Sequence, residues 1–183
     1  IREKSSANKK KNFLKIQIKF QVISLIRNEL NSIQLNKINM EKHQYNLDLE
    51  WIGERKGILS SPDFLSTIEV VTPPEFDKGI AGFWSPEHLF TAAVQSCFMT
   101  TFLAVADYSK LEIEKLTCKA EGILQNIDGK FLMTEVILKP TINILKEEDR
   151  EKTEKIILKA EKACLISNSI TSKVTLESNV LVG

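Results

Sequence analysis

The stretch SPEHLFTAAVQSCFMTTFLAVADY, residues 85–108, predicts the helix around which the rest of the chain is organised. It opens with a strong helix start: Ser85 suits the N-cap, Pro86 suits the first helical position, and Glu87 places an acid in the first turn. From Leu89 to Tyr108 almost every residue is apolar or small. A helix that is apolar all round is buried on every side. We therefore expect this helix to be central or to be covered by a second subunit.

Strands are predicted on both sides of this helix. Before it, Tyr45–Trp51 alternates apolar and polar residues, which is typical of a half-buried strand. The other predicted elements are a strand near Ile58, strands at Ser66–Val71, Ile113–Leu124, Phe131–Leu145 and Ser172–Leu181, a hairpin turn at Asp128-Gly129, and a charged helix at Lys146–Leu165 with Ile156, Ala160, Ala163 and Cys164 on its buried stripe. This order predicts an α+β domain with an antiparallel sheet.

Residues 1–39 differ from the rest of the chain. They contain no Gly and no Pro and carry nine Lys/Arg against two Asp/Glu, whereas residues 40–183 carry sixteen against twenty-two. We expect 1–39 to be an extension outside the fold (a tail, upstream sequence or a basic targeting segment) and 40–183 to form the domain. The acidic balance of that domain argues against nucleic-acid binding. No apolar run approaches the roughly 18 residues that a transmembrane helix needs, so we expect no membrane contact.

Cysteine and histidine usage narrows the chemistry. The three cysteines are far apart and form no C-x-x-C motif, which does not resemble a secreted disulfide scaffold. A reducing, intracellular compartment fits better, and we expect the protein to be cytoplasmic. His43 and His88 are the two histidines and lie far apart in sequence. Because a zinc site usually needs four clustered ligands, we expect no metal.

Each cysteine has a different context. Cys118 alternates with apolar neighbours on a predicted strand, which favours a buried structural thiol. Cys97 lies in the middle of the apolar helix, where apolar surroundings raise a thiol pKa and the helix dipole gives little help. A reactive Cys97 needs a cation, and Arg55, on a turn between two glycines, is the leading candidate. Cys164 lies near a helix C-terminus, which disfavours a thiolate. By pattern alone, Cys97 and Cys164 are better explained as core residues.

Two segments of the chain resemble the signatures of one protein family. SPEHLFTAA at 85–93, followed by SCF at 96–98, resembles the first signature of the OsmC/Ohr family of organic hydroperoxide reductases. ACLISNS at 163–169 resembles the second-cysteine motif of that family. The resemblance runs over about residues 41–182 in element order and is closest to the general OsmC-like branch. It implies an OsmC-like fold assembled as an intertwined homodimer.

The resemblance also implies roles for matching residues. Cys97 corresponds to the peroxidatic cysteine, Cys164 to the resolving cysteine, and Glu87 to the partner of the active-site arginine, for which Arg55 is the candidate. In the implied reaction Cys97 becomes a sulfenic acid and condenses with Cys164, and a thiol, a dithiol or a lipoylated protein restores both, without metal, haem or flavin. Glu87 precedes Cys97 by ten residues, which in a continuous helix is a rise of about 15 Å and too far for contact. Either the helix breaks between them, or Glu87 serves the Cys97 site of a second subunit.

The substrate and the function class are less constrained by the sequence. Phe90, Phe98, Met99 and Phe102 are expected to form an apolar pocket near Cys97 that favours organic hydroperoxides, or else to be ordinary core residues. Two other functions remain open. One is a non-catalytic dimer that binds acyl or thiol ligands in the same pocket. The other is a redox sensor in which the disulfide changes conformation for a partner protein.

Overall fold

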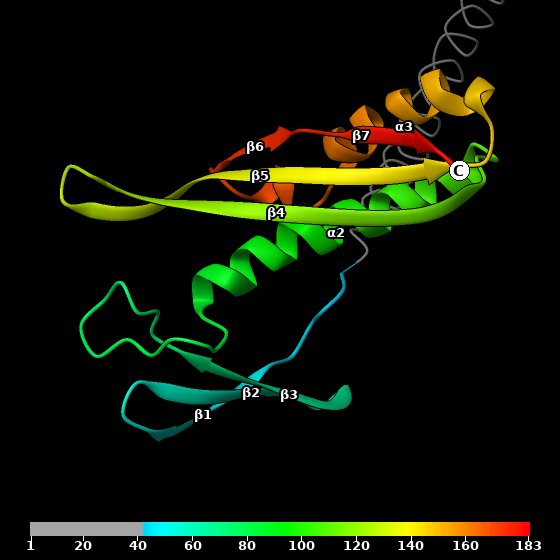
Figure 1. Cartoon of the computed structure of the whole chain (residues 1–183). Coiled ribbons are helices and arrows are strands. Elements are labelled where there is room, and N and C mark those ends of the chain that lie inside the picture. The colour runs from blue at the N-terminus through cyan, green and yellow to red at the C-terminus, as the bar shows by residue number, and fades with distance from the viewer. Residues whose placement is uncertain (1–41) are drawn as a thin grey trace, which may run out of the picture. The chain divides into compact units, whose positions relative to one another are not determined.

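The computed structural model describes residues 42–183, so the expected extension at 1–39 lies outside the described residues. One compact unit spans Asn46–Gly183. Its elements (Figure 1) are β1 (Asp48–Gly53), β2 (Lys56–Ser61), β3 (Phe64–Val71), α2 (Pro86–Tyr108), β4 (Ile113–Ile127), β5 (Lys130–Ile144), α3 (Arg150–Ala163), β6 (Lys173–Leu176) and β7 (Asn179–Val182), with 3₁₀ turns at Glu147–Asp149 and Ser167–Ser169.

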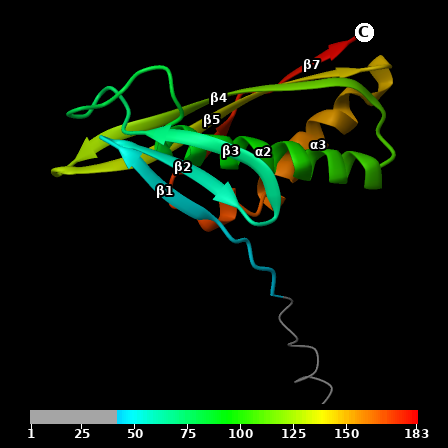
Figure 2. The same ribbon diagram turned by 90° about the horizontal axis from the view of Figure 1, so that it is seen from below.

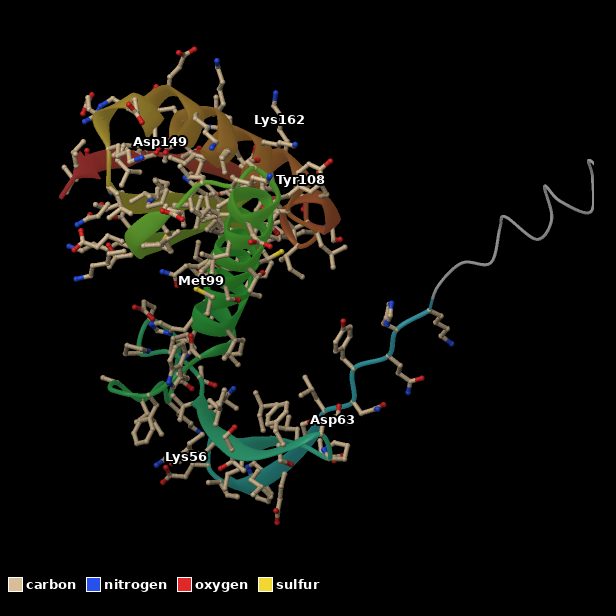
Figure 3. All side chains as sticks on the ribbon, turned by 90° about the vertical axis from the view of Figure 1, so that its right-hand side faces the viewer. Lys56, Asp63, Met99, Tyr108, Asp149 and Lys162 are labelled. Carbon is tan, nitrogen blue, oxygen red and sulfur yellow. The ribbon has the colours of Figure 1, made fainter. Side chains whose placement is uncertain are left out.

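The first sheet is an antiparallel meander in the order β1-β2-β3. The Val71 amide donates to the Trp84 carbonyl over 2.9 Å, which ties the end of β3 to the segment that leads into α2. Many apolar side chains of this sheet stand in solvent (Figure 3), and Trp51 is 75% exposed. Large apolar side chains exposed on one sheet are typical of a protein interface. Within residues 42–183, no other element packs over this sheet.

The second sheet is built on the long antiparallel hairpin of β4 and β5, which runs along α2 in Figures 1 and 2. Asp128 and Gly129 join the strands with φ of 50° and 81°, the positive values that a tight hairpin turn requires. The hairpin predicted at this dipeptide is therefore confirmed. β6 and β7 add to the other edge of β5 and run parallel to it. The sheet is mixed rather than wholly antiparallel.

The final strand predicted at Ser172–Leu181 is divided into β6 and β7 in the structure. The gap falls opposite Lys139 and Pro140 of β5. Proline has no N–H to donate to a ladder, so continuous pairing at this point would lack a hydrogen bond. Because β6 and β7 are separated at this point, β5 can hold Pro140 in its interior at little cost in hydrogen bonds.

Helix α2 begins as the sequence predicts, and it is unbroken over 23 residues. The Ser85 hydroxyl accepts from the His88 amide at 3.4 Å, and Pro86 occupies the first helical position. One stripe of the helix packs against β4, β5 and α3 and is buried at Val94, Phe98, Phe102 and Ala106. The rest is not: Met99 and Tyr108 (labelled in Figure 3) are 38% and 85% exposed. The expectation that α2 is buried on every side is therefore wrong within a single chain, and its coverage by a second subunit stays a prediction.

The hydropathy of α2 also corrects an expectation about membranes. The helix is long enough, and with a mean hydropathy of 1.6 apolar enough, to cross a bilayer. The expectation that the chain has no run of this kind is therefore wrong. The small and hydroxylated residues of α2 do not lower its mean hydropathy below the value of a membrane-spanning helix. Core helices of folded domains have the same property, and α2 packs against the second sheet and α3.

Helix α3 is shorter than the predicted Lys146–Leu165. A 3₁₀ turn at Glu147–Asp149 precedes it, and Cys164 is its C-cap. Its buried stripe holds Thr153, Ile156, Ile157 and Ala160. Ala163 was expected on that stripe but is exposed. The backbone leaves the helical conformation at Cys164, and the side chain of this residue is fully buried.

Candidate functional site

Cys97 and Cys164 lie side by side, and both are free thiols. Cys97 is half-buried on α2, whereas Cys164 is fully buried at the end of α3. The Ile166 amide donates to the Cys97 sulfur over 3.5 Å. The hydroxyl oxygen of Thr101, one helical turn further along α2, lies 4.0 Å from the same sulfur. The fold therefore brings a second thiol, a backbone amide donor and a hydroxyl group to Cys97.

These contacts change the acidity of the two thiols in opposite directions. Burial acts to raise the pKa of Cys97, but hydrogen bonds to its sulfur, above all from the Cys164 thiol, outweigh burial and hold this pKa below its ordinary value. Burial raises the pKa of Cys164, and the neighbouring Cys97 raises it further. Cys97 is therefore the thiol of the pair that ionises first, while Cys164 keeps its proton.

The loop after α3 is held by hydrogen bonds at its base. The side-chain amide of Asn168 donates to the carbonyls of Lys162 and Cys164, at 2.9 Å each. The backbone amide of Asn168 also donates to the Cys164 carbonyl, at 3.1 Å. These carbonyls belong to the helix end, where no intrahelical partner is available. The loop that carries the Ile166 amide is thus fixed to the end of α3.

Arg55 and Glu87 are brought together, but away from the Cys97 of their own chain. Both line a pocket of about 400 Å³ at the β1–β2 turn and the start of α2. One carboxylate oxygen of Glu87 is buried without a hydrogen-bond partner among residues 42–183. Because α2 is unbroken, Glu87 and its own Cys97 are separated by about 15 Å along the helix axis. The expectation of a helix break between them is excluded.

No arginine is among the groups that hold the pKa of Cys97 low within residues 42–183. Arg55, the cation expected beside this thiol, is exposed and forms no ion pair in the described part of the chain. Within residues 42–183, one chain therefore supplies hydrogen bonds to the Cys97 sulfur but no positive charge beside it.

The four residues expected to form an apolar pocket near Cys97 lie in different environments. Phe98 and Phe102 are fully buried in the core, with ring centroids 6.2 Å apart, so they line no accessible pocket. Phe90 is half-buried and lines a pocket of about 570 Å³ together with the loop after Cys164. Met99 is exposed and lines a different pocket, which Cys118 shares. Residues one or two positions from Cys97 face other directions, because each step turns a helix by about 100°.

Cys118 lies on β4 and packs partly against the core. Burial raises the pKa of its thiol. Its carbonyl accepts a 2.6 Å hydrogen bond from the side chain of Gln95, which joins β4 to α2. Residues 42–183 contain no cluster of three or more His, Cys, Asp or Glu side chains that could bind a metal.

Two groups at the site were not identified from the sequence. Thr101 is four residues after Cys97, a spacing that places two side chains on one helix face, and this spacing could have identified it. The Ile166 amide carries no sequence signal, because a backbone N–H is common to every residue except proline. Only the fold brings it to a sulfur 69 residues away in the chain.

The geometry can now be compared with known proteins. A family model for OsmC-like proteins matches residues 79–179, which include both cysteines of the pair and all of α2. The chain belongs to the OsmC-like family. This confirms the family that the two signature segments indicate.

Relatives of this OsmC-like chain support the same assignment. It is 30% identical to the uncharacterized protein YmaD of Bacillus subtilis over 152 residues, 79% of this chain and 99% of YmaD. The OsmC-like protein of unknown function VCA0330 from Vibrio cholerae has a TM-score of 0.67 at 25% identity, covering 75% of this chain and 99% of that one. An organic hydroperoxide resistance protein OsmC from Legionella pneumophila has a TM-score of 0.61 at 28% identity, covering 76% and 99%. The OsmC-like α+β fold is thus confirmed.

Proposed function

We propose that this OsmC-like protein is a thiol-dependent peroxidase that reduces organic hydroperoxides, with Cys97 as the attacking thiol and Cys164 as the resolving thiol. The observation that carries the proposal is the adjacent pair of free thiols, in which the half-buried Cys97 has the lowered pKa and the fully buried Cys164 the raised pKa. A structural relative named for organic hydroperoxide resistance supports the substrate class.

The first step uses the ionised sulfur of Cys97. The thiolate attacks the terminal oxygen of the hydroperoxide, so an S–O bond forms as the O–O bond breaks. The leaving alkoxide takes up a proton and departs as an alcohol. The sulfur is oxidised to a sulfenic acid, and the peroxide is reduced by the same two electrons.

The second step uses Cys164. The negative charge on Cys97 raises the pKa of Cys164, and this charge disappears when Cys97 becomes a neutral sulfenic acid. Cys164 then ionises more readily and attacks the Cys97 sulfur, which forms a disulfide and releases the hydroxyl as water. An external thiol, a dithiol or a lipoylated protein reduces the disulfide by exchange. Both thiols are thereby restored for the next cycle.

In this proposal the active unit is an intertwined homodimer. Arg55 and Glu87 of one subunit complete the Cys97 site of the other, where the guanidinium supplies a permanent positive charge. Three features of the single chain support this: the exposed apolar side chains of β1 and β3, the exposed face of α2, and the buried Glu87 oxygen without a partner in residues 42–183. A second copy provides surface to cover all three.

The apolar part of the substrate is proposed to bind beside Phe90. Phe90 precedes Cys97 by seven residues, two helical turns, and so shares its face of α2. Its pocket is also lined by Phe131 and Leu132 of the hairpin and by Ile170 of the loop after Cys164. Apolar walls favour a hydrocarbon group by removing it from water, so organic hydroperoxides are preferred over hydrogen peroxide.

A steady-state assay with cumene hydroperoxide and dihydrolipoamide tests the function. We expect Cys97→Ser to abolish turnover. Cys164→Ser is expected to stop after one equivalent of peroxide and to leave a sulfenic acid that dimedone traps on Cys97. Cys118→Ser is the matched control and is expected to retain wild-type turnover, because this thiol lies outside the pair.

The alternatives predict different results in the same assay. A ligand-binding dimer consumes no peroxide with any donor. A redox sensor forms the disulfide once but is regenerated slowly by every thiol. Wild-type protein with intact free thiols that consumes neither cumene hydroperoxide nor hydrogen peroxide would remove the proposed function.

A further inference from the structure

The hydrogen bonds at Cys97 come from the chain that carries it. Cys97 is in the middle of α2, where the backbone amides of the helix are already bonded and the helix dipole contributes little. Besides the Cys164 thiol and the Leu165 backbone, the Ile166 amide reaches the sulfur at 3.5 Å, and the Thr101 hydroxyl, which can donate to the ionised sulfur, lies at 4.0 Å. Hydrogen bonds to the ionised form of a group favour that form. The described chain thus contains its own means of stabilising the thiolate.

We infer that Thr101, by donating to the sulfur, and Asn168, as a positioning residue, build a hydrogen-bond cradle for the Cys97 thiolate within one subunit. The inference rests on the proposed function, in which this sulfur attacks the peroxide, and names two further residues for it. Neither residue touches the reacting oxygen. Thr101 acts by direct donation to the sulfur, and Asn168 acts by fixing the loop that presents the Ile166 amide.

Asn168 is placed to control the direction of that amide. Its side chain and backbone together donate three hydrogen bonds to the end of α3, at Lys162 and Cys164. The Ser169 amide closes the turn by donating to the Ile166 carbonyl at 2.9 Å. Ile166 is therefore held from both sides, and its N–H points to Cys97 rather than to water. The same bonds fix the backbone of Cys164, so Asn168 also sets the approach of the second thiol.

Thr101 is distinguished from its neighbour by what its hydroxyl contacts. The Thr100 hydroxyl donates to the carbonyls of Ser96 and Cys97, at 3.2 and 3.1 Å, and so is used within the helix backbone. The Thr101 hydroxyl lies against the Cys97 sulfur instead. Two adjacent threonines on one helix thus provide a test residue and a matched control.

The first experiment measures the pH profile of alkylation of Cys97 by iodoacetamide, with the modified thiol identified by peptide mass and Cys118 followed as an internal reference. We expect Thr101→Val to move the profile to higher pH and to slow alkylation roughly threefold on its acidic side, the effect of losing one weak charge-assisted hydrogen bond. Thr101→Ser restores the hydroxyl and the wild-type profile. Thr100→Val leaves the profile unchanged.

The profile reports on the cradle because few other charges face the sulfur. Among residues 42–183 the ionisable group at Cys97 is the Cys164 thiol, whose contact is common to every variant. In the proposed dimer, Arg55 adds a charge that does not titrate in this range. A shift that appears with Thr101→Val and not with Thr100→Val therefore comes from the lost donor.

The second experiment replaces Asn168 by Asp, which has the same shape but turns a carboxylate toward two carbonyls. We expect the alkylation profile to move to higher pH, and the sulfenic acid on Cys97, trapped by dimedone after one equivalent of peroxide, to persist at least severalfold longer. Asn126→Asp is the control, because the Asn126 side chain accepts a 2.9 Å hydrogen bond from the Gly129 amide, which Asp also accepts. Melting curves show whether each variant is folded.

The outcomes separate this inference from the proposed function. If wild-type Cys97 is alkylated no faster than Cys118 at low pH, the proposed function is in error. If wild-type Cys97 is reactive but Thr101→Val and Asn168→Asp both keep its profile, the cradle is refuted while the peroxidase stands. If Asn168→Asp does not fold, the Thr101→Val profile alone decides.

Discussion

The proposed division of one site between two subunits gives a prediction with a definite magnitude. Glu87 is about 15 Å along α2 from its own Cys97, and Arg55 lines the same pocket as Glu87. In the proposed dimer, Arg55→Ala removes the positive charge beside the partner's thiolate. This substitution is expected to slow peroxide reduction roughly tenfold or more. Cys97→Ser removes the sulfur altogether. A mixed dimer of these two variants, isolated with two affinity tags, then holds one complete site, so its activity per dimer is about half that of the wild type.

A second mixed dimer reverses the expectation. When both substitutions, Arg55→Ala and Cys97→Ser, are placed in one subunit and the other subunit is wild type, the intact Cys97 faces the altered Arg55. This dimer is expected to be nearly inactive. A site completed within one subunit gives the opposite pair of results: no activity in the first dimer and half in the second. The control pairs Cys97→Ser with Arg150→Ala, an arginine on α3 bonded to Glu147, and keeps half activity in both cases.

Three further predictions concern stability. Phe98→Ala removes a fully buried ring and is expected to lower the unfolding free energy in urea by about 3–5 kcal/mol, whereas a loss below 1 kcal/mol would contradict its place in the core. Gly122→Ala puts a Cβ 2.1 Å from the Thr91 hydroxyl oxygen and is expected to cost about 1–3 kcal/mol, with part of the loss recovered in a Thr91→Ala background; no recovery would mean that another contact limits β4. Under reducing conditions, stability is expected to fall as pH rises above the ordinary thiol pKa, because folding raises the pKa of Cys118 and Cys164 and the unfolded chain then loses protons first. Cys118→Ala should reduce that pH dependence in urea titrations, and an unchanged slope would count against it.

Features that depend on neighbouring residues could be predicted from the sequence. The start of α2 follows from Ser85 and Pro86, and the β4–β5 turn follows from Asp128-Gly129, because each needs only a local backbone preference. The family signatures located both cysteines in the same way. Such patterns describe a few residues at a time and are complete without knowledge of the fold.

Features set by contacts between distant segments could not be predicted. Helix periodicity shows which residues share a face, but not which face meets the sheet, so Phe98 was grouped with Cys97 by proximity although it turns into the core. Val94 lies four residues before Phe98 and Phe102 lies four residues after it, and both are buried like Phe98. The parallel pairing of β6 and β7 with β5 depends on a crossover that no local pattern encodes.

The parallel pairing of β5 with β6 has a consequence for when reactivity arises during folding. To run alongside β5 in the same direction, the chain must first return along the sheet, and α3 with the loop after it is that return path. Cys164 lies at the C-terminal end of α3 within this return path. The segment after it is fixed by the pairing of β6 and by the Ser172 hydroxyl, which donates to the Met133 carbonyl. An incompletely folded chain therefore carries ordinary thiols. The lowered pKa of Cys97 is therefore a property of the finished tertiary structure.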